Sequence, residues 1–227
     1  MILKIYFEEQ GSLIPFQHQD VLNGVFYKTL LKGNPEFHNG FSDYAVSSIQ
    51  NCHQVNDGLM PYSGKKPYIQ VASKNEHLIV ELLTSLGNLI DSKTKVFFDR
   101  TITNFDLCDF EVSPYEYDII HTISPVLIVE NGQRYTFQNN EKWEDMLNEN
   151  CRQKLKHAGI EDSSFKIVCD KNKLKAKSVL VSTAYNKCTN FVGKVYGKPK
   201  TREVLYNLGI GGSTGSGFGS VAIVIPK

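Results

Sequence analysis

Six glycines fall within eleven residues near the end of the 227-residue chain, and they are the strongest chemical signal in the sequence. The stretch begins at Gly209, ends at Gly219 and leads into the apolar run 221–225. Glycine lacks a Cβ atom, so a ligand or another backbone segment can approach its main chain closely. Backbone amides left free in such a loop are suited to binding an anion, above all phosphate. The stretch therefore predicts an anion-binding loop before a buried last strand, rather than a flexible linker.

The familiar nucleotide-binding loops do not match this stretch. A P-loop needs a Gly-Lys-Ser/Thr ending, and the glycine stretch has none. A dinucleotide-binding fold needs a further βαβ unit after its glycine loop, and only eight residues follow Gly219. Both nucleotide-binding classes therefore fit this stretch poorly, and we expect neither.

The charge of the chain is unevenly distributed, although its formal net charge is only +1. Residues 164–227 hold eleven Lys and Arg against two acids, a net charge of +9, whereas residues 1–163 carry −8. Such an asymmetry predicts a polyanion-binding surface on the basic part, against the alternative of an ordinary solvated surface.

Lysines alternate with other residues from Lys171 to Lys177, which is the spacing that places side chains on one face of a strand. They could contact a phosphate backbone, or they could only keep a sheet edge from aggregating. Further basic residues precede the glycine stretch and could continue the same track. The candidate residues for binding a phosphate backbone are Lys173, Lys175, Lys177, Lys198, Lys200 and Arg202, together with Gly209, Gly211, Gly217 and Gly219.

Composition indicates a cytoplasmic protein. Hydrophobic residues make up 41% and charged residues 22% of the chain, which is ordinary for a soluble globular protein. We find no apolar run of the ~20 residues that a membrane helix needs and no signal peptide, so no membrane association is expected. Five scattered cysteines without a Cys-x-x-Cys pair indicate reduced thiols rather than disulfides or a metal site.

Hydrophobic periodicity predicts an α+β fold. Two successive β-α-β-β-α-β orders account for the chain, each typical of a ferredoxin-like, RNA-recognition-like domain. We expect domains at 1–115 and 119–227, the second carrying the glycine-rich loop. The predicted helices lie near 20–31, 75–86, 143–158 and 201–208, and the predicted strands lie near 2–8, 44–55, 67–72, 95–98, 103–112, 121–130, 165–169, 178–182, 191–196 and 221–225, with 165–169 and 178–182 expected to form a hairpin.

The glycine stretch and four other segments together resemble one family. Its pattern of Gly-x-Gly, five residues and Gly-x-Gly, with a hydrophobe at each centre, is similar to the C-terminal signature of CRISPR-associated endoribonucleases of the RAMP superfamily. Segments 14–19, 22–27 and 34–35 resemble the first helix region of that family, and 124–129 resembles its Ser-Pro-Ile strand. The matches span nearly the whole chain.

The resemblance implies cleavage of precursor CRISPR RNA within its repeats, without a metal or an organic cofactor. The ribose 2′-hydroxyl attacks the adjacent phosphorus and leaves a 2′,3′-cyclic phosphate and a 5′-hydroxyl. The reaction needs a base, an acid and donors for the phosphate charge. The family usually places a tyrosine in the first helix, and Tyr27 matches it, although Tyr27 could equally be a core residue.

The histidine of the family is where this sequence departs from the pattern. Ser42 stands at the usual histidine position, and His38 lies four residues earlier. On a helix these two residues would share a face, so we take His38, Tyr27 and Ser42 as candidate catalytic residues. The alternative is that His38 is an exposed and inert side chain, and that the enzyme is slow or inactive.

Three functions follow from these observations. The first is the endoribonuclease, acting as a monomer or homodimer on CRISPR repeat RNA. The second is a non-catalytic repeat-RNA-binding subunit, which would contact other subunits of a CRISPR effector complex. The third is a general single-stranded RNA binder of the RNA-recognition type, although the basic-aromatic strand motif of that module is missing here.

Overall fold

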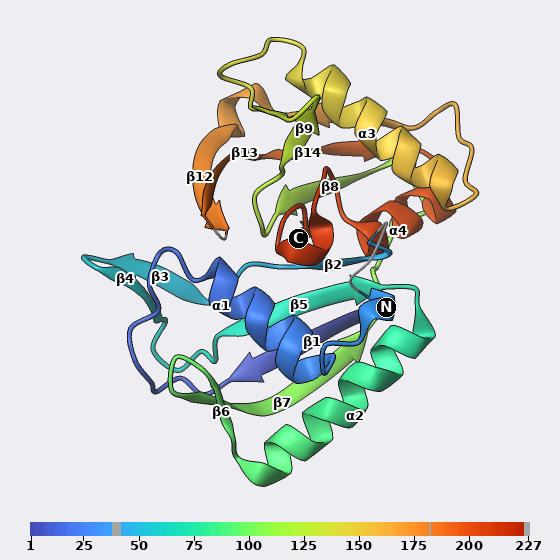
Figure 1. Ribbon diagram of the computed structural model, residues 1–227. Coiled ribbons are helices and arrows are strands. Elements are labelled where there is room, and N and C mark those ends of the chain that lie inside the picture. Colours follow the sequence, from blue (N-terminus) through green and yellow to red (C-terminus); the bar gives the residue numbers. More distant parts are fainter. Residues whose placement is uncertain (38–41, 182, 225–227) are drawn as a thin grey trace.

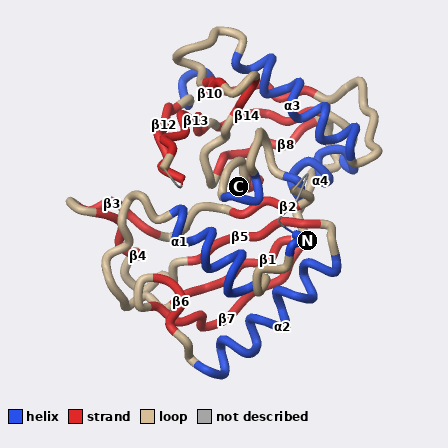
Figure 2. The backbone as a smooth tube through the Cα atoms, in the orientation of Figure 1, coloured by secondary structure: helices blue, strands red, loops and turns tan. Residues whose placement is uncertain are grey.

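The computed structural model describes residues 1–37, 42–181 and 183–224, and it has a mixed α+β architecture of two lobes (Figure 1). Each lobe is an antiparallel sheet with helices packed on one face. Figure 2 shows the strands of the two sheets as separate red groups, with blue helices beside each. Among the described residues, no helix is long and apolar enough to cross a membrane.

The first lobe is a sheet in the order β2-β5-β1-β7-β6, covered by α1, its continuation η1, and α2. Alternation along β1 explains its place in the centre of the sheet, because Leu3, Ile5 and Phe7 are all fully buried on one face. The elements are β1 (Ile2–Phe7), α1 (Gln19–Gly24), η1 (Val25–Leu30), β2 (Tyr44–Val46), β5 (Tyr68–Ser73), α2 (Glu76–Ser92), β6 (Lys95–Phe97) and β7 (Arg100–Cys108).

The second lobe repeats this topology with the order β11-β14-β8-β15. Its core lies between the sheet and two helices, with Trp143, Leu147 and Cys151 from α3 and Leu205 from α4. The elements are β8 (Tyr117–Thr122), α3 (Trp143–His157), β11 (Lys166–Cys169), β14 (Val192–Tyr196), α4 (Pro199–Leu208) and β15 (Val221–Ile223).

Both lobes place their four principal strands in the order second, third, first, fourth, which is the ferredoxin-like arrangement. The prediction of two tandem ferredoxin-like units is therefore confirmed. Smaller elements complete the chain: the hairpins β3 (Cys52–Val55)–β4 (Gly58–Pro61), β9 (Ile128–Glu130)–β10 (Gln133–Tyr135) and β12 (Lys175–Val181)–β13 (Ala184–Asn190), and the 3₁₀ turns η2 (Pro35–Phe37), η3 (Lys171–Lys173) and η4 (Thr214–Ser216).

Three predicted elements were wrong in detail. The segment 44–55 is two strands, and the second pairs in a hairpin with β4 instead of joining the sheet. The segment 121–130 likewise divides into β8 and β9. The expected hairpin of 165–169 with 178–182 does not form, because β11 pairs with β14 while β12 pairs with its immediate neighbour β13.

Polar contacts join the two lobes. The Gln70 side chain donates to the Val221 carbonyl at 3.2 Å, and the Gln50 side chain donates to the Ile123 carbonyl at 2.7 Å. The Lys74 ammonium forms an ion pair of 3.0 Å with Glu203. These contacts fix β2 and β5 of the first lobe beside the glycine-rich loop of the second, as Figure 1 shows.

Candidate functional site

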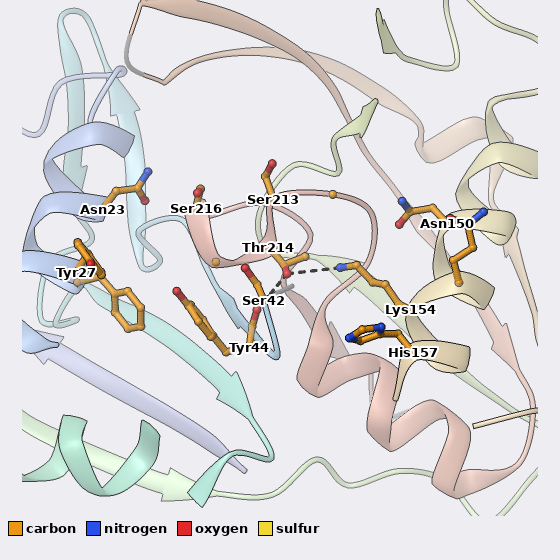
Figure 3. Close-up of a pocket in the computed structure, with 14 residues that line it drawn as sticks. Asn23, Tyr27, Ser42, Tyr44, Asn150, Lys154, His157, Ser213, Thr214 and Ser216 are labelled. Carbon is orange, nitrogen blue, oxygen red and sulfur yellow. Dashed lines mark hydrogen bonds between the residues drawn. The ribbon is translucent and has the colours of Figure 1, made fainter. Parts of the chain in front are cut away.

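A pocket of about 640 Å³ opens where the two lobes meet, and polar side chains line most of it (Figure 3). The first lobe supplies α1, η1 and the start of β2, and the second supplies α3 and the loop 212–216. Of the described residues that line the pocket, none is Asp or Glu. The lining residues are Asn23, Phe26, Tyr27, Ser42, Tyr44, Asn150, Gln153, Lys154, His157, Gly212, Ser213, Thr214, Gly215 and Ser216.

Tyr27 reaches the pocket from a stretch of helix that is wider than an α-helix. The Leu31 amide donates to the Phe26 carbonyl five residues back, at 3.0 Å, which is the π-helical bond. Such widened turns are rare and are often found at functional sites. The half-buried Tyr27 donates its hydroxyl to the Gly33 carbonyl at 3.0 Å, so its ring is held at the pocket wall.

Ser42 lies beside the glycine-rich loop and precedes Tyr44 by two residues in the sequence. A Cβ atom on Gly215 would lie 2.8 Å from the Ser42 hydroxyl oxygen and 3.0 Å from the Tyr44 ring. The Tyr44 hydroxyl donates to the Phe37 carbonyl at 2.8 Å, and burial raises the pKa of Tyr44 to about 12. Tyr44 therefore stays a neutral phenol that supports the loop.

Lys154 enters the pocket from α3, and its ammonium group is surrounded by oxygen acceptors of the loop. The Nζ atom donates to the carbonyls of Leu208 and Gly209 at 3.3 and 3.1 Å, and to the Thr214 hydroxyl at 3.5 Å. Burial lowers the pKa of Lys154 to about 8. Among the described residues, no carboxylate forms an ion pair with it.

His157 lies one turn further along α3 and also lines the pocket. Figure 3 shows the imidazole of His157 and the ammonium of Lys154 extending from the same helix toward the loop and Ser42. The pocket thus combines a phenol, hydroxyls, a histidine and a cation. Such a set can bind a phosphodiester and move protons near it.

Comparisons with known proteins decide the family. A family model described as "CRISPR associated protein Cas6, C-terminal" matches residues 109–223, slightly more than half of the chain. The chain belongs to the Cas6 family. The resemblance found in the sequence is therefore confirmed at the level of the family.

Similar proteins cover nearly the full length of this Cas6 family member. The "CRISPR-associated endoribonuclease Cas6 1" of Methanocaldococcus jannaschii is 26% identical over 236 residues, which is 95% of this chain and 89% of that protein. A structure from Pyrococcus furiosus, described as a Cas6-related gene, is 19% identical with a TM-score of 0.79 and covers 100% of this chain and 99% of that one. A structure described as "An RAMP protein binding different RNA substrates" is 16% identical with a TM-score of 0.79, covering 99% and 100%. The two structures share the fold.

The structure brings together two of the three candidate catalytic residues. Tyr27 and Ser42 both line the pocket. His38 lies outside the described residues. Lys154 and His157 were not among the predicted site residues, although both belong to a correctly predicted helix. Together with Asn150 and Gln153 they have the spacing of one helix face. This polar face was the feature of the sequence that could have pointed to them as site residues.

The four glycines predicted to bind RNA are buried against protein. A Cβ atom on Gly209 would lie 2.8 Å from that of Ala45, and one on Gly211 would lie 2.7 Å from the Leu127 carbonyl oxygen. Cβ atoms on Gly217 and Gly219 would run into the Gln19 side chain and the Ile210 carbonyl. These four glycines therefore determine the shape of the loop. The residues of the loop that line the pocket are 212–216.

Arg202 was predicted to bind RNA, and its position contradicts this. Its guanidinium is fully buried and lies 2.8 Å from the Asp118 carboxylate. It also donates to the carbonyls of Ser113 and Tyr115 at 2.7 and 2.6 Å. The Tyr206 hydroxyl donates to the same carboxylate at 2.9 Å. Arg202 therefore holds α4 to β8 and the connector before it.

The candidate lysines do not form one track. Lys173 belongs to η3, where it pairs with Asp170 at 3.9 Å, and only Lys175 and Lys177 lie on the strand β12. Lys198 and Lys200 are exposed at the N-terminal start of α4. The glycine-rich loop follows the C-terminal end of this ten-residue helix, and a helix of that length measures about 15 Å from end to end. The prediction that the lysines from Lys171 to Lys177 share one strand face is thus wrong, because Lys171 and Lys173 lie in η3.

Proposed function

We propose that this Cas6 family member is a metal-independent endoribonuclease that cleaves precursor CRISPR RNA within its repeats. The observation that carries the proposal is the pocket between the lobes, which offers Tyr27, Ser42, Lys154 and His157 and, among its described lining residues, no acid. A surface that carries a cation and no acid favours the binding of a polyanion such as RNA. The name of the Methanocaldococcus jannaschii relative, an endoribonuclease, supports the same reaction class.

In the proposed reaction the ribose 2′-hydroxyl loses its proton and its oxygen bonds to the adjacent phosphorus. The bond from phosphorus to the 5′-oxygen breaks, and that oxygen takes up a proton. The products are a 2′,3′-cyclic phosphate and a 5′-hydroxyl. Each proton transfer by a positioned side chain contributes ~10²–10⁴-fold.

Within this reaction Tyr27 orients the phosphate and Ser42 donates a hydrogen bond to it. His38 remains a candidate for proton transfer from outside the described residues. His157 is a histidine that the described part of the pocket offers for the same task. The exposed Lys175 and Lys177 on β12 would extend the RNA contact beyond the pocket.

A single-turnover assay on end-labelled repeat RNA tests the proposal. Wild-type protein should cleave in excess EDTA, and the 5′-product should end in a 2′,3′-cyclic phosphate. Replacing only the nucleotide before the cut with its 2′-deoxy form should abolish cleavage while the RNA still binds. Cleavage that needs a divalent cation, or that tolerates the 2′-deoxy nucleotide, would refute this mechanism.

The presence of Ser42 where the family usually has histidine favours a second candidate function. The protein would then bind repeat RNA without cutting it, as a subunit beside other CRISPR proteins. Tight binding of repeat RNA that stays intact would establish this alternative. We also keep as proposals the domain limits 1–115 and 119–227, a monomeric or homodimeric state, and a cytoplasmic location.

A further inference from the structure

Lys154 is a lysine whose side chain lies almost wholly inside the protein, with no carboxylate partner among the described residues. Only 7% of the residue is exposed. Burying an ammonium group is costly unless acceptors replace its water shell. Here the replacement comes from three oxygens of one short segment, the carbonyls of Leu208 and Gly209 and the hydroxyl of Thr214.

The two carbonyls belong to the C-terminal end of α4, where helical carbonyls lack intrahelical partners. This end of a helix also carries a partial negative charge, which favours a cation. Gly209 follows directly with φ = +73°, so the chain turns sharply away from the helix axis at this point. Lys154 therefore fixes the position at which the glycine-rich loop begins.

The third acceptor extends the contact into the other lobe. Thr214 is 1% exposed, and its hydroxyl accepts from Lys154 while donating its own proton to the Tyr44 carbonyl at 3.0 Å. Tyr44 begins β2, and Ser42 lies two residues before it. Figure 3 draws this path from Lys154 through Thr214 toward Ser42 and Tyr44.

The path joins three parts of the pocket wall: α3, the loop 212–216 and the start of β2. The loop is also held by backbone hydrogen bonds, from the Gly212 amide to the Leu127 carbonyl at 2.7 Å and from the Ser216 amide to the Ser213 carbonyl at 2.9 Å, while Ser213 at its tip is exposed. A misplacement of ~1 Å in a site can lower a rate ~10²-fold. The geometry of the path is thus coupled to that of the phosphate-binding surface.

We propose that Lys154 is a positioning residue which, through Thr214, holds the glycine-rich loop against β2 in the arrangement that cleavage requires. Lys154 acts on the loop and not on the reacting atoms. The inference rests on the proposed endoribonuclease function for its effect on rate. Its effect on the loop is independent of any activity.

Amide hydrogen exchange tests the structural half without RNA. Lys154→Met and Thr214→Val should each speed exchange at the Gly212 and Ser216 amides about tenfold or more, while the amides of β1 stay protected. Thr214→Ser keeps the hydroxyl and should leave exchange unchanged. The matched control is Lys156→Met, an exposed lysine on the same helix. Unchanged loop exchange in Lys154→Met would overturn the inference.

Single-turnover cleavage at saturating protein tests the functional half. Lys154→Met and Thr214→Val should each lower the rate about tenfold or more, and the double variant should be no slower than the slower single variant, because both break one path. Thr214→Ser and Lys156→Met should cleave within about twofold of wild type. Multiplying effects in the double variant, or full rates in Lys154→Met, would contradict the proposal. A wild-type protein that does not cleave would refute the proposed function instead, and the exchange result would still decide the role of Lys154.

Discussion

Gly219 gives a sharp test of why the loop is rich in glycine. Its φ of +65° lies in the left-handed region, where an L side chain costs about 1–2 kcal/mol. A Cβ atom here would also run into the carbonyl of Ile210, a fully buried residue whose amide donates to the Gly219 carbonyl at 2.8 Å. Forced overpacking of this kind adds about 1–3 kcal/mol. Gly219→Ala should therefore lower the free energy of unfolding by about 2–5 kcal/mol.

Gly132 supplies a control that separates backbone strain from collision. Its φ is +77°, and a Cβ atom there would meet nothing within 4 Å. Gly132→Ala should cost only the strain, about 1–2 kcal/mol. Urea unfolding followed by circular dichroism measures both variants. If Gly219→Ala and Gly132→Ala lose equal stability, the packing of the loop does not require glycine at position 219. The close approach of RNA to the loop backbone would then explain the glycines.

Three further predictions concern the site and its supports. Arg202→Met leaves the buried Asp118 carboxylate without its cation, so it should cost about 3–5 kcal/mol of unfolding free energy, whereas Lys198→Met should cost little by the same denaturation measurement. His157→Ala should slow single-turnover cleavage about 100-fold if this histidine transfers a proton, with an unchanged melting temperature. Because the Lys154 pKa falls from an ordinary ~10.4 to about 8 on folding, the unfolded chain binds more protons between these values. Wild-type stability should therefore rise relative to Lys154→Met from pH 8 to pH 10 in denaturation curves.

The fold was readable from the sequence because its elements carry strong periodic patterns. Leu3, Ile5 and Phe7 alternate as a half-buried strand must. The predicted helix at 143–158 lies within one residue of α3, whose apolar positions recur at helical spacing. Two repeats of the same element order then left the ferredoxin-like arrangement as the simplest topology.

Strand partners were less readable, because alternation shows a face but not a neighbour. Residues 178–181 belong to β12, which pairs with β13, the next strand in the sequence. The alternating pattern of β11 resembles that of β12, so it did not show which of the two strands joins the sheet. Local pairing of this type requires little loop closure. The sequence offered no signal that would separate a hairpin partner from a sheet partner here.

The site was predicted in part. Tyr27 and Ser42 do line one pocket, because the resemblance carried information about the first helix and the loop after it. Lys154 was missed, since a lysine in a polar helix pattern gives no sign that the loop of another segment will bury it. Arg202 was misassigned for the opposite reason. Its charge is matched by Asp118, 84 residues away in sequence, and only the fold brings the two together.

The most direct test of this account is cleavage of the natural repeat RNA by wild-type protein in EDTA, with and without a single 2′-deoxy substitution before the cut. We predict cleavage of the all-ribose RNA to a 2′,3′-cyclic phosphate and no cleavage of the substituted RNA, at equal binding. Repeat RNA that binds tightly and stays whole in both forms would contradict the endoribonuclease and leave an RNA-binding subunit on the same fold.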